Sequence, residues 1–394
     1  MTTIQSSSVP SPVPSLVIDA DGHVLEPADM YTNYIDPKFR DRALRIACDE
    51  KGHENLIIDN KPYQSTTMRG NLGAIGGIGM DPKLLYTRGA VTYAKGSPPG
   101  GYEPKARLKV MDEEGIDIAL LYPTLGIFWE GSVQDPQLAT AYTRAYNRWI
   151  VEFCRENPKR LYPIAHISLI DPEGAVEETL RARKEGCIGV YLSPDLAARR
   201  DKRLDDPSFE RFWEMVQDLQ MPIAFHVVVR EQQTFHEWTR RLDGRPGPLG
   251  LFGHSFLGID VMTAFTSMLT LGMFEKYPGL KCAVLEAGAS WIGAWLDRMD
   301  YKSEVTQFMS PNTLKPSEYF YRQCVVSADP DESMTAQIVQ HMGADYFVWA
   351  SDYPHIDASL GVVKEMKERL APLPEVDQRK VLGENALRFY QIAQ

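Results

Sequence analysis

The sequence predicts an α/β fold, a (β/α)8 TIM barrel that carries a long insertion after its first strand. Short runs of β-type residues alternate along the 394-residue chain with longer amphipathic stretches, a pattern typical of βα units and a parallel sheet. Eight such runs are present, the strand count of a (β/α)8 barrel. A doubly wound open sheet remains the alternative, because a sequence alone does not show whether a sheet closes.

The predicted strands are short and apolar. They cover residues 17–21, 118–122, 162–169, 189–192, 223–229, 280–285, 323–327 and 346–350. Helices are predicted over residues 105–114, 137–156, 172–185, 207–219, 255–277, 291–301, 332–342 and 376–391. Several of these helices begin at proline or end at glycine, as helix termini commonly do.

The interval between the first two strands is much longer than a usual βα connection. Its glycine-rich stretches, 70–79 and 96–101, lack the strand-to-helix context and the Lys-Ser/Thr ending of a phosphate loop. We therefore interpret residues 28–104 as a cap over the substrate, with a shorter excursion at 230–253. Aromatic residues in these regions indicate a substrate with apolar bulk, or loops packed by their own side chains: Tyr63, Tyr86, Tyr93, Trp129 and Trp238.

The composition narrows the class of protein. Lys and Arg number 42 against 53 Asp and Glu, a net charge of -11, and no basic run has interleaved aromatics, which argues against a nucleic-acid partner. The five cysteines are odd in number and widely spaced, as expected for reduced thiols of a cytoplasmic protein. No stretch has the length of a membrane span, and the Ser/Pro-rich residues 1–15 predict a flexible arm rather than a signal peptide. Residues 16–394 are predicted to form one domain.

The first strand ends in two residues of metal-ligand type, Asp21 and His23. Side chains two positions apart lie on the same side of a strand, so this carboxylate and this imidazole would converge, with Glu26 just beyond. Such a set can hold a divalent cation. The alternative is a strand that ends in a polar turn.

Three later strands also present ligand-type residues where barrel chemistry is located. His226 lies in the fifth strand, Glu286 follows the sixth and Asp352 follows the eighth. A single buried histidine or helix-capping carboxylate is common, but their joint placement favours a metal site made by Asp21, His23, His226 and Asp352.

Several motifs, in order, resemble the amidohydrolase superfamily, in the branch that contains aminocarboxymuconate semialdehyde decarboxylase. They lie at residues 21–27, 107–117, around His226, at 351–355 and at 383–386. The resemblance covers most of the chain from Val17 onward. It implies that Asp21, His23, His226 and Asp352 are metal ligands, with Zn, Fe or Mn as the ion.

The chain departs from this family at the sixth strand, where the better known decarboxylases have a histidine and this sequence has Glu286. Glu286 could act as an acid if burial raised its pKa, or it could bind a second metal ion. His254 could supply the missing acid-base function, or it could be a surface residue at a helix start. Substrate contacts are expected from Tyr353, His355, His166 and Glu26.

The preferred function is a metal-dependent hydrolase of a small carbonyl compound, with Asp352 moving the proton of water. The alternatives are a non-oxidative decarboxylase of an aromatic or unsaturated acid, and a barrel that only binds a ligand. The resemblance to a family whose members form oligomers and the apolar face of residues 291–296 predict a homodimer, although core packing explains that face equally well.

Overall fold

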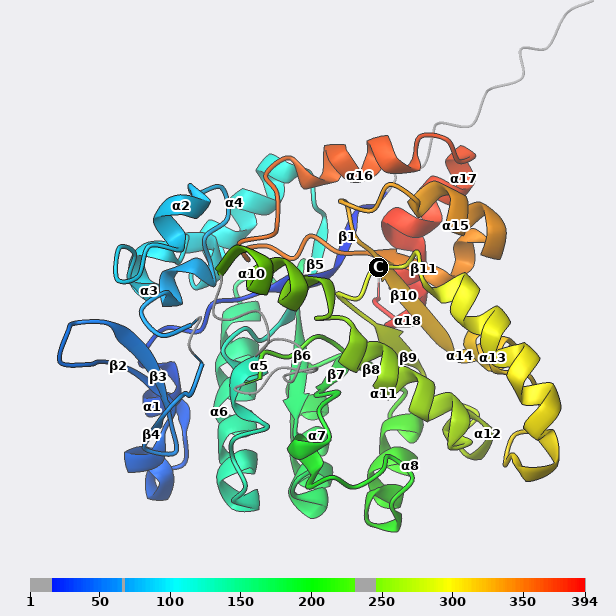
Figure 1. Ribbon diagram of the computed structural model, residues 1–394, viewed down its shortest axis with the longest axis horizontal. Helices are drawn as coiled ribbons and strands as arrows, with labels where there is room; N and C mark the ends of the chain where they lie inside the picture. Colours follow the sequence, from blue (N-terminus) through cyan, green and yellow to red (C-terminus); the bar gives the residue numbers. More distant parts are fainter. Residues whose placement is uncertain (1–15, 66–67, 231–245, 394) are drawn as a thin grey trace, which may run out of the picture.

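Eight parallel strands form a nearly closed barrel in the computed structural model, which describes residues 16–65, 68–230 and 246–393 (Figure 1). Each strand pairs with the next along the chain, so the predicted barrel is confirmed. The strands are β1 (Ile18–His23), β5 (Ile118–Tyr122), β6 (Leu161–Ile167), β7 (Gly189–Leu192), β8 (Ile223–Phe225), β9 (Cys282–Val284), β10 (Cys324–Ala328) and β11 (Phe347–Trp349). The predicted fifth strand, residues 223–229, ends at Phe225 in the structure, and the predicted eighth strand, residues 346–350, covers only Phe347–Trp349, because the chain continues as loops there.

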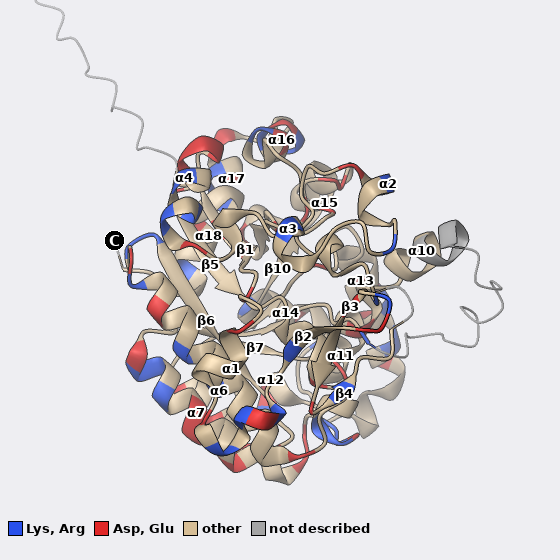
Figure 2. Cartoon of the chain, turned by 90° about the vertical axis from the view of Figure 1, so that its left-hand side faces the viewer, with Lys and Arg blue, Asp and Glu red and all other residues tan. Residues whose placement is uncertain are grey.

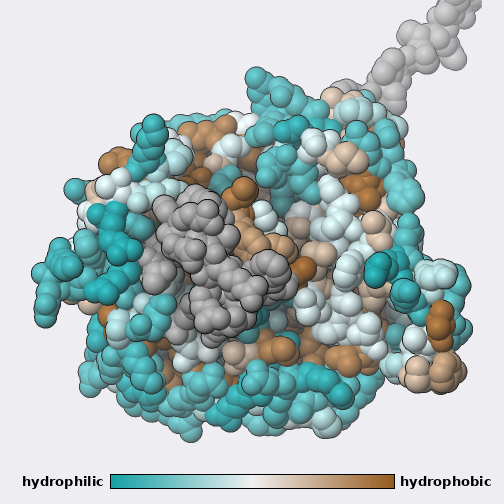
Figure 3. All heavy atoms as spheres, viewed as in Figure 1, coloured by the Kyte–Doolittle hydropathy of each residue, from teal (hydrophilic) through white to brown (hydrophobic). Residues whose placement is uncertain are grey.

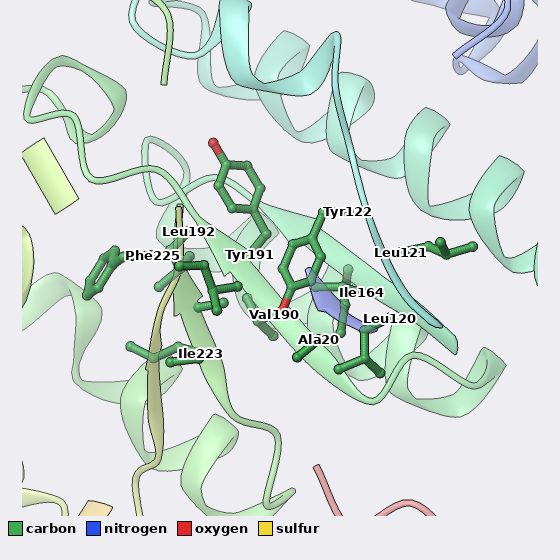
Figure 4. Close-up of a cluster of buried hydrophobic side chains, with 14 of the residues drawn as sticks. Ala20, Leu120, Leu121, Tyr122, Ile164, Val190, Tyr191, Leu192, Ile223 and Phe225 are labelled. Carbon is green, nitrogen blue, oxygen red and sulfur yellow. The ribbon is translucent and has the colours of Figure 1, made fainter. Parts of the chain in front are cut away.

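Both faces of the barrel strands are covered by packed side chains. Parallel register places Val190 of β7 opposite Ile223 of β8, and Ile164 of β6 opposite Gly189. Figure 4 shows these aliphatic side chains packed together with Leu120 and Ala20. All of them are buried, as expected for strands whose two faces are both covered.

The barrel closes beyond the end of β11, not along it. The main-chain N–H of His23 donates to the carbonyl of Tyr353 at 2.8 Å, and that of Asp352 donates to the carbonyl of Asp21 at 3.1 Å. These two bonds join the segment after β11 to β1, so the first and last ligand-bearing segments meet at the seam.

Helices cover the outside of the barrel close to the predicted ranges. They include α4 (Pro104–Glu114), α6 (Pro136–Cys154), α7 (Pro172–Glu185), α8 (Glu210–Asp218), α13 (Ile292–Thr306) and α15 (Thr335–Met342). The C-terminal stretch is α17 (Glu375–Arg379), a π-helical turn η8 (Lys380–Glu384) and α18 (Asn385–Phe389). Two helices, α14 (Pro316–Gln323) and α16 (Val362–Leu370), were not predicted. Acidic and basic residues alternate over these outer helices (Figure 2), and the visible surface is mostly hydrophilic (Figure 3).

The single helix predicted over residues 255–277 is wrong. The structure has α10 (Pro246–Ser255), α11 (Ile259–Thr270) and α12 (Met273–Lys276). Gly272 separates the last two with φ +72°, a left-handed conformation that glycine adopts without strain.

The inserted segment, residues 28–104, contains secondary structure that the sequence did not reveal. A small antiparallel sheet consists of β2 (Arg45–Cys48), β3 (Glu54–Ile58) and β4 (Lys61–Pro62). Short helices surround it: α1 (Met30–Tyr34), η1 (Pro37–Arg42), η2 (Leu72–Ala74), α2 (Pro82–Leu85), α3 (Tyr93–Gly96) and η3 (Pro99–Gly101).

Glycines in this segment allow close packing rather than phosphate binding. A Cβ atom on Gly96 would lie 1.9 Å from the carbonyl oxygen of Gly73, so η2 and α3 touch only because both residues are glycine. Tyr63 donates a hydrogen bond to the carbonyl of Val229, and Tyr93 donates to that of Glu26. Two of the predicted cap aromatics thus fasten the inserted segment to the barrel. The role of a cap remains a prediction.

Other sequence expectations have mixed outcomes. Trp129 packs in the core between Tyr142 and His166 rather than in a cap, whereas Trp238 and the predicted arm lie outside the described residues. The apolar face of α13 is used internally, since the indole of Trp295 donates to Thr266 of α11. None of the described helices combines the length and apolar character needed to cross a membrane.

Candidate metal centre

Two histidine rings from different strands meet inside the barrel mouth. His23, the last residue of β1, and His226, the residue after β8, have their Nε2 atoms 2.9 Å apart. Their Nδ1 atoms face carbonyl oxygens, that of Pro123 at 3.0 Å and that of Val227 at 2.9 Å. A carbonyl only accepts, so we assign the ring protons to Nδ1. The two Nε2 lone pairs then face each other, an arrangement that a cation stabilises.

Asp21 completes this set. Its Oδ1 lies 3.5 Å from Nε2 of His23 and its Oδ2 lies 3.8 Å from Nε2 of His226, yet neither oxygen has a hydrogen-bond partner among the described residues. Burial raises the pKa of Asp21 well above its usual value; the nearby His226 opposes this shift, and the carboxyl groups around it add to it. A divalent cation would supply the missing positive charge.

These observations fit a divalent metal ion. Two imidazole nitrogens and a carboxylate are ligands that zinc, iron and manganese accept. Nitrogens about 2.1 Å from one ion would lie about 3.0 Å apart at a right angle, close to the 2.9 Å between the Nε2 atoms of His23 and His226. Burial lowers the pKa of His23 well below its usual value, which keeps the ring neutral and able to bind metal. Asp21, His23 and His226 have ligand atoms within 4.8 Å of one another.

Asp352 lies on the other side of His23, with its Oδ1 3.6 Å from Nε2 of that ring. The same oxygen lies 2.6 Å from Nδ1 of His355, and Nε2 of His355 lies 2.8 Å from the hydroxyl oxygen of Thr124. Burial lowers the pKa of His355, but the charge and hydrogen bond of Asp352, together with the charges of Glu286 and Asp357, outweigh it and raise the pKa to about 9. Both ring nitrogens of His355 thus have partners, and the ring orients Asp352; its predicted contact with substrate stays a prediction.

Glu286 extends the site toward the opening. Its Oε2 lies 2.7 Å from Nε2 of His226, and its side chain is 20% exposed. Burial, followed by the charge of Asp357, raises the pKa of Glu286 to about 8. Glu286, Asp352 and Asp357 form a second group of ligand-type atoms, separate from the group of Asp21, His23 and His226.

The residues of the open side have unusual backbone conformations. Glu286 has φ +49° and Asp352 has φ +51°, in the left-handed region that side chains other than glycine seldom adopt. The N–H of Glu286 donates to the hydroxyl of Ser327, and the N–H of Gly288 donates to Asp329. These acceptors, one in β10 and one just after it, hold Glu286 in its strained conformation.

A buried ion pair supports β1 from behind the ligands. Asp19 accepts hydrogen bonds from the N–H and hydroxyl of Ser351 and lies 3.6 Å from Arg107, whose Nη1 also donates to the carbonyl of His23 at 2.7 Å. A Cβ atom on Gly22 would lie 2.4 Å from Asp19 and 2.5 Å from Arg107. Only glycine fits between Asp21 and His23, which explains the Asp-Gly-His sequence.

Three predicted site residues lie away from the metal centre. His254 is exposed in the last turn of α10 and belongs to none of the ligand groups of the described residues, so we do not place it in the chemistry. Tyr353 packs its ring under the guanidinium of Arg107. Glu26 is fully buried and accepts three backbone N–H bonds from residues 124–126, so its carboxylate holds the loop after β5; its predicted contact with substrate stays a prediction.

His166, predicted to contact substrate, is enclosed in the core. Its Nε2 lies 2.7 Å from Oε1 of Glu130, and its ring packs between Trp129 and Tyr191. The side chain has no exposed surface, so it supports the barrel wall behind the site.

Sequence reasoning missed several residues that shape the site. Thr124, Ser327, Asp329 and Tyr191 all lie at or just beyond the ends of β5, β10 and β7. Strand-end position was the available signal, but it selects many polar residues and does not tell which of them point inward.

Comparison with known proteins agrees with this geometry. The amidohydrolase family model matches residues 18–392. The chain belongs to the amidohydrolase family. Among solved structures, this amidohydrolase is similar to an amidohydrolase from Mycobacterium avium subsp. paratuberculosis K-10, with a TM-score of 0.76, 23% identity and coverage of 96% of this chain and 100% of the other.

Two decarboxylases also share the fold. The 5-carboxyvanillate decarboxylase of Sphingomonas paucimobilis has a TM-score of 0.66 and 20% identity, with 96% of this amidohydrolase and 99% of that chain covered. A dihydroxybenzoic acid decarboxylase of Polaromonas sp. JS666, solved with manganese and 2-nitroresorcinol, has a TM-score of 0.64 and 18% identity, with coverage of 96% and 98%. At such identities the likeness shows the fold alone.

Proposed function

We propose that this amidohydrolase is a metal-dependent, non-oxidative decarboxylase of an aromatic carboxylic acid. The observation that carries the proposal is the carboxyl group of Glu286, which lies 2.7 Å from a metal-ligand histidine and is partly exposed. Decarboxylation needs an acid beside the metal to protonate the carbon that loses carbon dioxide. The similarity to two aromatic-acid decarboxylases supports this choice over the hydrolase that the sequence favoured.

Asp21, His23, His226 and Asp352 would hold the metal ion in this proposal. The ion supplies a positive charge that binds and orients the substrate carboxylate. Manganese is the first metal to test, because the similar dihydroxybenzoic acid decarboxylase was solved with it. Zinc and iron suit the same donor set.

Glu286 moves the proton. In its protonated form, the hydroxyl on Oε2 donates to the ring carbon as the carbon–carboxylate bond breaks, so that carbon dioxide leaves and a C–H bond forms. Solvent then returns a proton to the carboxylate, which the partial exposure of the side chain allows. Asp352 is kept in place by His355 and is not required to carry this proton.

The second candidate is a metal-dependent hydrolase. The 2.6 Å contact between His355 and Asp352 favours it, because the imidazole keeps the carboxylate ionised and in place, where it can act as a base toward water. The two candidates differ in product: hydrolysis incorporates water oxygen, whereas decarboxylation releases carbon dioxide.

The test is to incubate the manganese-loaded enzyme with 5-carboxyvanillate, 2,6-dihydroxybenzoate and related aromatic acids in heavy water. We expect release of carbon dioxide and one deuterium on the carbon that carried the carboxylate, detected by mass spectrometry. Protein stripped with chelator is the control. Turnover of esters, lactones or amides without any carbon dioxide release would replace the proposal with the hydrolase.

A further inference from the structure

Two buried tyrosines pack against the metal-ligand ring of His226. Tyr122, at the end of β5, stacks on it with ring centroids 6.2 Å apart and an interplanar angle of 16°. Tyr191, in β7, meets it edge to face at 6.1 Å and 88°. The two residues are equally buried, so the difference between them lies in their hydroxyl groups.

The hydroxyl of Tyr122 points to the closed end of the barrel. It lies 3.0 Å from the hydroxyl of Tyr390. The ring of Tyr390 lies 3.2 Å from the Cβ position of Gly189, the first residue of β7, and so belongs to the end of the barrel where the strands begin. The Tyr122 hydroxyl is therefore a paired structural group.

The hydroxyl of Tyr191 points the opposite way, as Figure 4 shows. The carboxyl groups that act on its pKa belong to Glu130, Asp195 and Glu286, all in segments that follow strand ends. A phenol is neutral at neutral pH, so the Tyr191 hydroxyl is a hydrogen-bond donor. The hydroxyl thus lies at the mouth, on the same side as the metal centre.

The neighbours of this hydroxyl are already engaged elsewhere. Glu130 binds His166 at 2.7 Å, and Asp195 lies 3.3 Å from Arg230. The hydroxyl of Ser193 lies beside the Tyr191 oxygen and acts on it as a hydrogen-bond donor, while its own oxygen accepts the N–H of Asp195. No acceptor for the Tyr191 O–H lies within hydrogen-bond distance in the part of the chain that the structure describes.

Buried polar atoms without partners are rare in native proteins, and each calls for a ligand or a functional reason. Three groups of this kind lie around His226: both oxygens of Asp21, Oε2 of Glu286 and the hydroxyl of Tyr191. A metal ion accounts for Asp21, and the reacting substrate accounts for Glu286. An oxygen of the same substrate can accept a hydrogen bond from the Tyr191 hydroxyl.

We propose that Tyr191 is a substrate-binding residue, whose hydroxyl donates a hydrogen bond to a carboxylate or phenolate oxygen of an aromatic acid at the metal centre. The proposal rests on the proposed function for the class of ligand only. It needs binding of such an anion, not its decarboxylation.

The test compares Tyr191→Phe with Tyr122→Phe in the manganese-loaded enzyme, with salicylate as the probe and calorimetry as the readout. Loss of a hydrogen bond to a charged oxygen should weaken salicylate binding about tenfold to a hundredfold in Y191F. Y122F should bind within about twofold of the wild type, because its hydroxyl points away from the mouth.

Thermal unfolding separates binding from folding effects. Y191F removes a buried hydroxyl that has no acceptor and should melt at or above the wild-type temperature, whereas Y122F leaves Tyr390 without its partner and should melt lower. Metal content should be unchanged in both variants.

Y191F that binds salicylate as tightly as the wild type would overturn the inference and leave a bound water as the partner of the hydroxyl. A wild-type enzyme that does not bind salicylate would overturn it too. Salicylate binding that depends on Tyr191, without any release of carbon dioxide from the aromatic acids, would support the inference and refute the decarboxylase proposal. Failure of the inference and failure of the proposed function therefore give different results.

Discussion

The two sides of the metal centre differ in how they meet solvent. Asp21, His23 and His226 have side chains that are at most 1% exposed, whereas Glu286 is 20% and Asp352 is 18% exposed. On the closed side, Asp21, His23 and His226 all have negative φ, and Asp19 and Arg107 hold β1 in place. The open side has two residues with left-handed backbone conformations.

This difference assigns different tasks to the two sides. A fully buried set of donors can fix an ion but leaves no room for a reactant. Partly exposed carboxyl groups can exchange protons with solvent and reach a substrate. Changes on the closed side should therefore abolish metal binding, and changes on the open side should slow the reaction with the metal still bound.

The largest effect is expected on the closed side. Asp21→Asn removes the buried carboxylate, so metal content should fall from about one ion per chain to near zero and kcat/KM should drop about a thousandfold or more. Elemental analysis and initial rates measure both. Asp297→Asn on α13 changes an exposed carboxylate and should leave both unchanged; metal retention in D21N would contradict the division of the site.

Glu286→Gln tests the open side and should lower kcat about a hundredfold to ten-thousandfold while metal content stays near that of the wild type. The amide keeps the shape of the side chain but has no acidic proton to transfer. Asp357→Asn removes the neighbouring exposed carboxylate and should lower kcat far less. Loss of metal in E286Q would instead make Glu286 a ligand.

His355→Gln should weaken metal affinity about tenfold to a hundredfold, because Asp352 loses the ring that orients it. Thr124→Val should have a smaller effect in the same direction, and Thr124→Ser should restore the wild-type affinity by keeping the hydroxyl. Competition with a fluorescent chelator measures all three. Equal affinity in H355Q and the wild type would remove His355 from the support of the site.

The pH dependence of the free energy of unfolding tests the role of Glu26, which is buried behind the closed side of the site. Burial raises its pKa from 4.5 to about 7, against the opposing effect of its hydrogen bonds with backbone N–H groups. A raised folded-state pKa contributes stability that is fully present below pH 4.5 and is lost as the pH rises through 7, roughly 3 kcal/mol in all. Urea unfolding at pH 5 and pH 8 should show a smaller pH dependence in Glu26→Gln than in the wild type; parallel profiles would refute this.

The smallest effect concerns the hydroxyl pair below the site. Tyr122→Phe should lower the free energy of unfolding by about 1 kcal/mol, because Tyr390 keeps a buried hydroxyl without its partner. Chemical unfolding at one pH measures it. A Tyr122→Phe variant as stable as the wild type would mean that water replaces the lost hydroxyl.

The sequence predicted the barrel because alternating apolar runs and amphipathic stretches are local patterns, and each forms a strand or a helix for the same physical reason in any chain. It located Asp21, His23, His226 and Asp352 because side-chain alternation and strand-end position are set by the chain itself. It missed the small sheet β2–β4, whose strands are short and only partly buried. It also joined α11 and α12 into one helix, because a glycine inside an apolar stretch does not by itself predict a left-handed turn.

The roles of the remaining site residues depended on tertiary contacts. Tyr353 follows Asp352 directly but turns under Arg107, and His355 turns back to Asp352. Glu26 follows the metal-binding strand yet faces backbone donors of another loop. Tyr191 and Tyr122 look alike in the sequence, and only the packed barrel gives one hydroxyl a partner and leaves the other without an acceptor. The sequence by itself determined which side chains could bind a metal, because ligand type and strand periodicity are local. Only the tertiary structure decided which of them converge, because hydrogen-bond partners and burial come from segments far apart in the chain.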